Sequence, residues 1–241
     1  MAEKFVSRGF FGKRQPADKA ERVPPGQYIT QDFPVLTAGP TPRIPLDAWT
    51  FTIEGLVKEK ASWNWEEFLR LPAQTFVVDI SCVTKWTKLD MRWEGISVDS
   101  LLEHVKLDPK AKFVTAFSHE GYTTNLPIED VINGKAFIAT QYDGKPLAPE
   151  HGGPARMVVP KLYFWKSAKW VTGSGSAIFG LYGTAEKASR AMGSLRENEL
   201  AGGKVLRFSL VGRARYRSLW RRALDEHIST NVWPLRSRYL R

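Results

Sequence analysis

The sequence predicts an α+β domain with many short strands and a few short helices. Stretches rich in β-branched and aromatic residues recur at short intervals, and only two segments have the spacing of a helix. The regular strand–helix–strand alternation of a doubly wound sheet does not occur. With 241 residues, of which 43% are apolar and 25% charged, the chain is long enough to bury one sizeable core.

The first elements follow from charge, proline and alternation. Residues 1–26 predict a flexible charged arm, because a polar stretch without apolar periodicity runs into a Pro-Pro-Gly turn. Several prolines over residues 33–42 predict an irregular apolar loop. Trp49, Phe51 and Ile53 alternate with polar residues and predict a half-buried strand.

Two helices and five further strands are expected after that strand. Asn64 is a good N-cap for a short helix that Pro72 ends. Ser97 or Asp99 can cap a second helix that continues through Leu102 and Val105. The further strands are expected over residues 75–83, 113–117, 136–142, 156–159 and 168–171.

Composition divides the chain at about residue 172. Residues 1–172 hold 22 Lys and Arg against 20 Asp and Glu, whereas residues 173–241 hold 13 against 5, and most of those 13 are Arg. We therefore predict a domain over residues 27–172 and a separate Arg-rich segment over residues 173–241.

Cysteine usage and hydropathy exclude several classes of protein. Cys82 is the single cysteine, so the chain forms no intramolecular disulfide and no four-thiolate metal site on its own. We expect a cytoplasmic protein. No apolar run reaches the roughly 18 residues that a membrane span needs, and the polar N-terminus does not resemble a secretory signal.

Three segments carry candidate chemistry. Cys82 ends a predicted strand, and Lys85 and Lys88 lie close enough in sequence to favour its thiolate; the alternative is a small buried apolar residue. Paired glycines after His151 let a ligand approach the backbone, and Arg156 suits a phosphate or a heterocycle edge. The alternative there is a loop histidine beside a surface arginine.

The third segment, residues 163–170, interleaves aromatic residues with lysines. A stacking platform for nucleic acid is one interpretation. The alternation favours a strand instead, with Lys169 directed into a polar pocket.

These three segments, in this order, resemble the sulfite-oxidase-like oxidoreductase molybdopterin-binding domain family over residues 27–172. The motif Cys-Val-x-x-Trp-Thr at Cys82 is similar to that of the methionine-sulfoxide-reducing branch. The run over residues 147–160 resembles the family's His-Gly-x-Pro-x-Arg signature, with a one-residue shift of its first proline. Ser167, Ala168 and Lys169 complete the resemblance.

The resemblance implies the mixed, barrel-like sheet fold of sulfite oxidases and a molybdopterin cofactor. Its molybdenum would take Cys82 as protein ligand, which makes Cys82 the catalytic residue. The residues that the resemblance implies as cofactor contacts are His151, Arg156, Ser167, Ala168, Lys169, Thr115, Asp32 and Phe33. The implied activity is oxygen-atom transfer on a small sulfoxide-type compound, with a separate flavin or haem protein as the electron-transfer partner. We expect a monomer and no nucleic-acid partner.

Two departures from the family pattern change these expectations. Sulfite-oxidising relatives place arginines where this sequence has Thr30 and Thr87, which favours a neutral oxo-compound over the sulfite dianion. From Gly173 onward the family's acidic, aromatic C-terminus is replaced, and Tyr182 does not match the family's active-site tyrosine. We interpret this segment as a frameshifted or otherwise replaced C-terminus.

A second function class remains open at this point. Residues 207–222 have the pattern of a basic amphipathic segment, which suits an acidic partner or an anionic surface. The alternative to an enzyme is therefore a non-catalytic relative that keeps the fold and acts as a basic binding module.

Overall fold

The computed structural model describes residues 21–36, 40–119, 122–172, 179–184 and 186–187. The chain divides into two units, Met1–Glu197 and Asn198–Arg241, and every described residue belongs to the first. Most of the predicted arm, the basic amphipathic segment at 207–222 and most of the Arg-rich segment lie outside the described residues. No helix in the described part of the chain is long and apolar enough to cross a bilayer.

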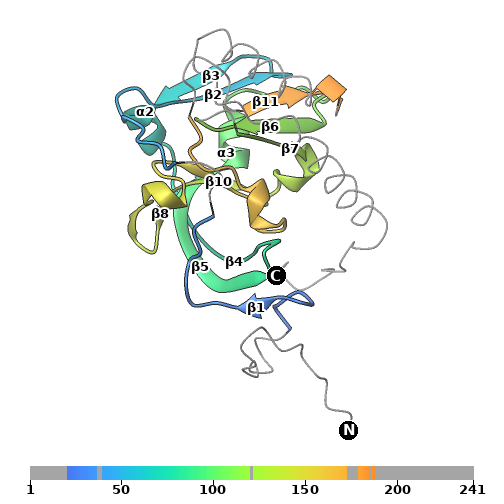
Figure 1. Cartoon of the computed structure of the whole chain (residues 1–241). Coiled ribbons are helices and arrows are strands. Elements are labelled where there is room, and N and C mark those ends of the chain that lie inside the picture. The colour runs from blue at the N-terminus through green and yellow to red at the C-terminus, as the bar shows by residue number, and fades with distance from the viewer. Residues whose placement is uncertain (1–20, 37–39, 120–121, 173–178, 185, 188–241) are drawn as a thin grey trace, which may run out of the picture. The chain divides into compact units, whose positions relative to one another are not determined.

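Two mixed sheets form the described part of the first unit (Figure 1). Sheet A runs in the order β1 (Tyr28–Ile29), β5 (Trp86–Ser97), β8 (Phe137–Tyr142), β10 (Arg156–Val158), with β4 (Gln74–Ser81) paired to β5 and β9 (Lys145–Pro146) paired to β8. Sheet B runs in the order β3 (Ala61–Asn64), β2 (Thr50–Gly55), β11 (Phe179–Tyr182), β6 (Phe113–Phe117), β7 (Thr123–Pro127).

Each sheet combines the two strand orientations. The β1–β5 and β2–β11 pairs are parallel, and the other pairs are antiparallel. Among the described residues both sheets stay open and neither closes into a barrel. The α+β class is confirmed.

Local capping explains where the helices begin. In α2 (Trp65–Leu69), Asn64 Oδ1 accepts from the Glu67 backbone N–H at 2.9 Å, and Glu67 Oε2 accepts from the Asn64 N–H at 2.9 Å. This reciprocal pair is a capping box. Ser97 caps α3 (Val98–Glu103) through the Asp99 N–H. Three short 3-10 helices follow in the chain: η1 (Ile128–Asp130), η2 (Pro149–His151) and η3 (Phe164–Lys166).

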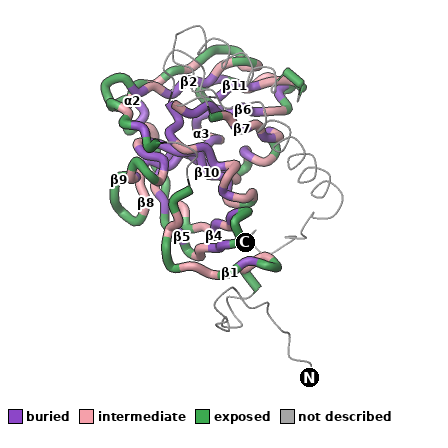
Figure 2. Tube along the Cα trace, viewed as in Figure 1, coloured by how far each residue is buried: buried purple, intermediate pink, exposed green. Residues whose placement is uncertain are grey.

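Two buried clusters hold the fold together (Figure 2). The larger joins sheet B to α2 and α3, and the smaller lies against β4, β5 and β8. Strand β8 serves both, because Ile138 packs in the larger cluster while Phe137 and Ala139 pack in the smaller. Successive side chains of a strand point to opposite faces, so β8 separates the two clusters. Cys82 belongs to the smaller one.

The prediction of a strand over residues 168–171 is wrong. The chain forms η3 and then continues without strand pairing, apart from a single bridge between Val171 and Ser118. Trp170 has a φ of 53°, which interrupts an extended run. Its backbone N–H donates to the Gly152 carbonyl at 3.0 Å, and the Ala168 carbonyl accepts from the Met157 N–H of β10 at 2.9 Å, so the segment is held by separate backbone bonds and not by a strand ladder.

Six strands, β1, β3, β5, β7, β9 and β11, went unpredicted, and β5 and β11 illustrate two different reasons. The long strand β5 carries polar residues at irregular intervals, because Asp90 with a φ of 54° and shifts in its pairing with β4 and β8 break the alternation. Strand β11 lies after Gly173, in the segment expected to be separate from the domain, yet it pairs with both β2 and β6 in the middle of sheet B.

Candidate functional site

A tight hairpin between β4 and β5 holds Cys82. The Cys82 N–H donates to the Trp86 carbonyl at 2.9 Å, and the Lys85 N–H donates to the Cys82 carbonyl at 3.0 Å. Lys85 closes this three-residue loop with a φ of 71°, the left-handed conformation that such hairpins require. The pairing of Ser81 with Thr87 continues to the next pair, Cys82 with Trp86. The side chains of Cys82 and Trp86 therefore lie on one face of the hairpin.

A glutamine that precedes β1 fastens the Cys82 turn. Gln27 is buried and its Nε2 donates to the Cys82 carbonyl at 3.0 Å. Thr87 Oγ1 lies 3.4 Å from Gln27 Oε1 and 2.9 Å from Ser81 Oγ. Sequence reasoning missed Gln27, because no local pattern connects it to a residue 55 positions away.

The glycines after His151 make room for the chain itself. A Cβ on Gly153 would lie 1.9 Å from the Leu147 carbonyl oxygen, and one on Gly152 would lie 3.0 Å from Lys169. Gly152 also has a φ of 105°, which favours glycine. The paired glycines therefore bring the His151 loop against the Lys169 segment, whereas the sequence suggested that they admit a ligand.

Phe33 connects the early loop to this site. Its ring stacks on the His151 imidazole with centroids 3.8 Å apart and planes at 5°. It also contacts Trp93 and Phe164, which line the cluster that contains Cys82. Burial lowers the pKa of His151, so its imidazole is neutral at neutral pH. Its Nδ1 is buried without a partner among the described residues.

Arg156 is the central cation of the site. It is 2% exposed, Nη1 donates to the His151 carbonyl at 2.6 Å, and Nη2 donates to the Ser167 carbonyl at 2.9 Å. The guanidinium lies 4.0 Å from the centroid of the Phe164 ring. Its Nε has no partner, and no carboxylate pairs with it, in the part of the chain that the structure describes.

The charge on Arg156 is costly in this environment. Burial lowers the pKa of Arg156 to about 9, which is still above neutral pH, while the nearby Tyr122 and Cys82 raise it. Lys85 is exposed on the turn, and Lys88 Nζ donates to the Gln31 carbonyl. Arg156, which the sequence does not link to Cys82, therefore lies close enough to interact electrostatically with it.

Lys169 adds a second cation to the same loops. Its Nζ donates to the carbonyl oxygens of Glu150 at 2.6 Å and Leu36 at 3.0 Å. Burial, together with the charge of Arg156, lowers the pKa of Lys169 to about 8. Ser167 Oγ accepts from the Val159 N–H at 3.0 Å, which fixes the backbone beside it. Two clustered cations bonded to neutral carbonyl groups form a site that an anion would complete.

The pH dependence of folding tests this charge arrangement. In the cofactor-free protein, the free energy of unfolding should rise with pH above about 8, because up to pH 10.5 the unfolded chain keeps a proton on Lys169 that the folded protein loses. The slope from this one group is at most about 1.4 kcal/mol per pH unit. Urea titrations at several pH values between 8 and 9 measure it, and Arg156, whose pKa is about 9, adds to the rise in the upper part of this range.

A variant separates Lys169 from the other titrating groups. Lys169→Met should flatten the rise in unfolding free energy between pH 8 and 9, whereas Lys145→Met, at an exposed position in β9, should leave it unchanged. Equal slopes in the wild type and in Lys169→Met would contradict the assigned role.

A tyrosine that the sequence did not single out ties the β6–β7 hairpin to this site. The Tyr122 hydroxyl donates to the Trp165 carbonyl at 2.6 Å, and Lys166 Nζ donates to the Asn125 carbonyl at 3.0 Å. Burial raises the pKa of Tyr122 to about 12 although Arg156 opposes the rise, so the hydroxyl stays protonated. These two bonds anchor η3, which leads directly into Ser167.

The remaining predicted residues are placed as follows. Ala168 is fully buried, and its carbonyl accepts from the Met157 N–H at 2.9 Å. Asp32 is exposed, and its N–H donates to Thr30 Oγ1 at 3.1 Å. Thr115 is fully buried on β6, in sheet B, whereas Cys82 and Arg156 belong to sheet A and its hairpin. The structure therefore brings Cys82, Phe33, His151, Arg156 and the Ser167–Lys169 segment together.

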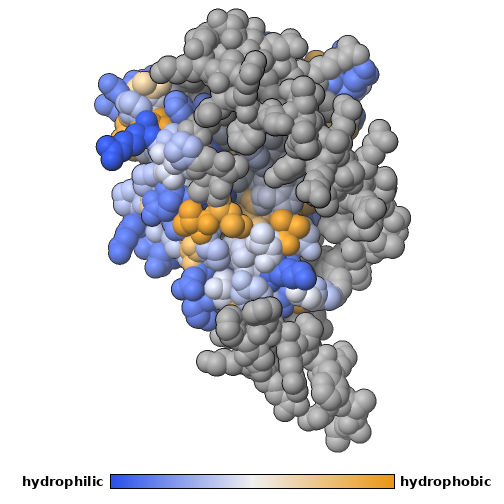
Figure 3. Space-filling model, in the orientation of Figure 1, coloured by the Kyte–Doolittle hydropathy of each residue, from blue (hydrophilic) through white to orange (hydrophobic). Residues whose placement is uncertain are grey.

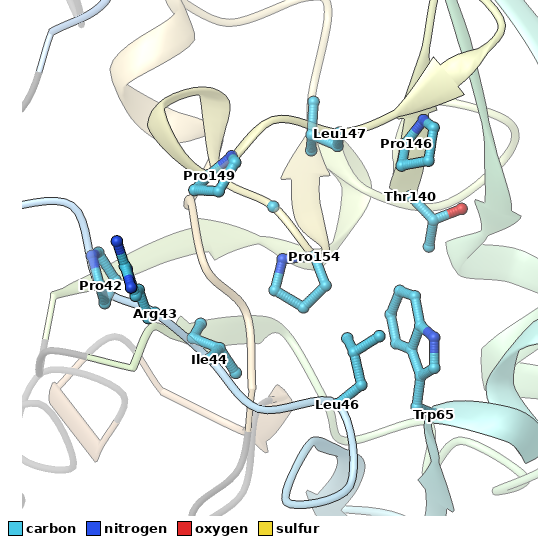
Figure 4. Close-up of a pocket in the computed structure, with 11 residues that line it drawn as sticks. Pro42, Arg43, Ile44, Leu46, Trp65, Thr140, Pro146, Leu147, Pro149 and Pro154 are labelled. Carbon is cyan, nitrogen blue, oxygen red and sulfur yellow. The ribbon is translucent and has the colours of Figure 1, made fainter.

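An apolar pocket of about 400 Å³ lies beside the His151 loop (Figure 4). Its lining includes Ile44, Trp65, Pro154 and Thr140, with Arg43 as its charged member. Leu147 of its lining also belongs to the cluster that contains Cys82, and Pro149, Gly153 and Pro154 flank the His151 loop. The pocket therefore borders the candidate site.

Exposed apolar side chains are spread over several elements. Figure 3 shows a small apolar group in the middle of an otherwise mostly polar face. The exposed large apolar residues are Tyr28, Val35, Leu36, Leu46, Leu69, Val77, Val83 and Tyr122. Val83 lies in the Cys82 hairpin, so this turn is open to solvent while its cysteine is buried.

Comparisons with known proteins place this geometry in context. The family model described as oxidoreductase molybdopterin binding domain matches residues 38–174. The chain is 39% identical over 165 residues to the uncharacterized oxidoreductase YuiH of Bacillus subtilis, covering 68% of this chain and 83% of that protein. It is 28% identical over 139 residues to the protein-methionine-sulfoxide reductase catalytic subunit MsrP of Gluconobacter oxydans, covering 50% of this chain and 44% of the relative.

One solved structure and one kinase complete the comparison. The sulfane dehydrogenase SoxCD from Paracoccus pantotrophus matches with a TM-score of 0.52 and 23% identity, over 60% of this chain and 40% of that one, which supports the fold. A 73-residue stretch is 49% identical to 4-diphosphocytidyl-2-C-methyl-D-erythritol kinase of Solibacter usitatus, covering 30% of this chain and 22% of the kinase. The chain thus spans most of YuiH but less than half of MsrP and SoxCD.

Proposed function

The chain belongs to the oxidoreductase molybdopterin binding domain family and is a molybdenum-dependent oxidoreductase that uses Mo-molybdopterin, and from this we propose that it transfers an oxygen atom to or from a small sulfoxide-type compound. The similarity to a protein named as a methionine-sulfoxide reductase subunit supports this substrate class. The alternative of a non-catalytic binding module rests on residues 207–222, which lie outside the described residues.

The observation that carries the proposal is the buried, uncompensated charge of Arg156. A guanidinium that is 2% exposed and has an unbonded Nε calls for an anionic partner. The phosphate of molybdopterin supplies that charge, and Lys169 adds a second cation for it. The His151 imidazole, stacked on Phe33, presents an unbonded Nδ1 to a polar heterocycle. The residues present therefore fit this cofactor.

Cys82 is the proposed protein ligand of the molybdenum. It is a free thiol with 4% exposure in an apolar cluster, and it interacts electrostatically with Arg156. When bound, the cofactor supplies the two-electron chemistry of oxygen-atom transfer. The protein holds the sulfur in place through the hairpin and Gln27, and the aromatic cluster around it excludes water.

A neutral substrate suits the residues beside the Cys82 turn. The Thr30 N–H donates to the Thr87 carbonyl at 2.9 Å, so the two threonines that replace the arginines of sulfite-oxidising relatives lie together. Thr87 is fully buried and bonds to Ser81. Neither hydroxyl neutralises a dianion as a guanidinium does, which supports a sulfoxide over sulfite. The electrons then come from a separate flavin or haem protein, and the enzyme acts as a monomer in the cytoplasm.

Metal analysis and a sulfoxide assay test the proposal. Protein purified from a molybdenum-replete host that makes molybdopterin should carry about one molybdenum per chain, as one cysteine ligand provides one site. It should also oxidise reduced methyl viologen when dimethyl sulfoxide or methionine sulfoxide is added. Absence of molybdenum under these conditions would contradict the cofactor site. A loaded protein that reduces neither sulfoxide would contradict the substrate class alone.

A further inference from the structure

Trp86 carries a buried hydrogen-bond donor that the fold leaves unused. Its side chain is 3% exposed, and its Nε1 has no partner among the described residues. Trp49 Nε1 donates to the Val171 carbonyl at 2.9 Å, and Trp170 Nε1 donates to the Pro149 carbonyl at 2.6 Å. An indole nitrogen is a donor only, and leaving it unpaired in the interior destabilises the protein. The donor of Trp86 therefore calls for an acceptor that the protein does not provide.

The position of Trp86 identifies where that acceptor lies. Trp86 is directly opposite Cys82 in the hairpin, so the two side chains project from one face with Cβ atoms about 4.5–5.5 Å apart. The indole meets the Phe164 ring edge-on, with centroids 5.9 Å apart, and Arg156 covers that same ring at 4.0 Å. The unpaired N–H thus belongs to the wall around the Cys82 sulfur.

A second tryptophan in the cluster shows why the position directly opposite Cys82 in the hairpin matters. Trp93 is fully buried and its Nε1 is also unpaired among the described residues. Its partners across the sheet are Phe76 and Tyr142, and not the cysteine. Of these two indoles, only Trp86 is the cross-strand neighbour of the proposed metal ligand.

We propose that the Trp86 indole N–H donates a hydrogen bond to the oxygen atom that is transferred at the site beside Cys82, the proposed metal ligand. This inference rests on the proposed function and adds a donor that selects the substrate. A sulfoxide oxygen is a strong, uncharged acceptor, so a neutral donor pairs with it without a buried excess charge. The acceptor oxygen arrives either with the cofactor or with the substrate, and both present it beside the cysteine sulfur.

The indole N–H signals of the protein labelled with ¹⁵N-tryptophan report this bond without any turnover. The Trp86 signal is assigned by its absence in Trp86→Phe. We expect it to move downfield and to exchange more slowly with solvent, either when the cofactor is loaded or when dimethyl sulfoxide is added to the loaded, oxidised protein. The first result assigns the acceptor to the cofactor and the second to the substrate. The Trp49 signal, already bonded to Val171, should stay in place and serves as the internal control.

Kinetics provide the second measurement. Trp86→Phe should lower kcat/KM for the sulfoxide by about 10-fold to 100-fold per bound molybdenum, as expected for one lost hydrogen bond to a reacting oxygen. Trp63→Phe, on β3 in sheet B, is the matched control and should retain wild-type kinetics. A Trp86 signal that moves in neither titration, or wild-type kcat/KM in Trp86→Phe, would overturn the proposal.

The outcomes also separate this inference from the proposed function. A wild-type protein that holds molybdenum but reduces no sulfoxide contradicts the substrate class. In that case the change in the Trp86 signal on cofactor loading still tests the hydrogen bond of the indole, because this measurement does not depend on sulfoxide turnover.

Discussion

Replacing Cys82 by serine should lower turnover by more than about 100-fold while the protein stays folded. Loss of a group that only orients a metal ligand already costs about 10-fold to 100-fold, and loss of the ligand itself costs more. Serine is similar in size to cysteine, so the hairpin bonds, which use the backbone of residue 82, are preserved. The buried hydroxyl should reduce the unfolding free energy by about 1–3 kcal/mol. Sulfoxide turnover, molybdenum content and urea unfolding measure the three effects.

The chain offers a matched control for this variant. Val83 is the next residue in the same turn and is 56% exposed, so Val83→Ala disturbs the loop without reaching the site. It should keep wild-type turnover and molybdenum content. Because Cys82 is the single cysteine, no other thiolate of this chain replaces it. Normal turnover in Cys82→Ser would show that the sulfur is not the metal ligand.

Local signals predicted much of the fold. Asn64, expected as an N-cap, forms a capping box with Glu67 within four residues, and Ser97 caps α3 as expected. The strand at Phe113–Phe117 has the expected bounds. Each of these depends on side chains and backbone within a few positions, which a single sequence displays directly.

The site could be predicted only in part, because its contacts are long-range. Cys82, His151, Arg156 and Lys169 were identified by their spacing and by the family resemblance. The roles of Gln27 and Tyr122 follow from hydrogen bonds across 55 and 43 positions, for which the sequence has no pattern. The unpaired indole of Trp86 likewise becomes visible only when the burial of its neighbours is known.

The end of the domain is the part that sequence patterns predicted least well. Family similarity stops at residue 174, yet Phe179–Tyr182 forms β11 between β2 and β6. Its apolar residues Phe179 and Leu181 are both 1% exposed, so this strand completes the core of sheet B. A short apolar stretch suffices to fill a gap between two strands, even where the flanking composition departs from the family.

The geometry of Arg156 can be tested apart from its charge by substituting lysine. Arg156→Lys keeps a cation, but one ammonium group cannot span the His151 and Ser167 carbonyls as the planar guanidinium does. We expect the cofactor-free protein to lose about 3 kcal/mol of unfolding free energy, as two charged hydrogen bonds are disrupted. Molybdenum content should fall by about 10-fold or more, because the two loops that enclose the cofactor separate.

Arg156→Met provides the comparison, because it removes the positive charge as well as the planar guanidinium group. Without a buried unpaired cation, the cofactor-free Met variant should be at least as stable as the Lys variant, yet it should retain even less molybdenum. Urea unfolding of the cofactor-free proteins and metal analysis of the purified ones give the two rankings. Wild-type molybdenum content in Arg156→Lys would show that the planar guanidinium group is dispensable. Equal molybdenum content in both variants would show that the positive charge at residue 156 contributes nothing to cofactor binding. The cofactor anion is stabilised only by a cation that lies close to it.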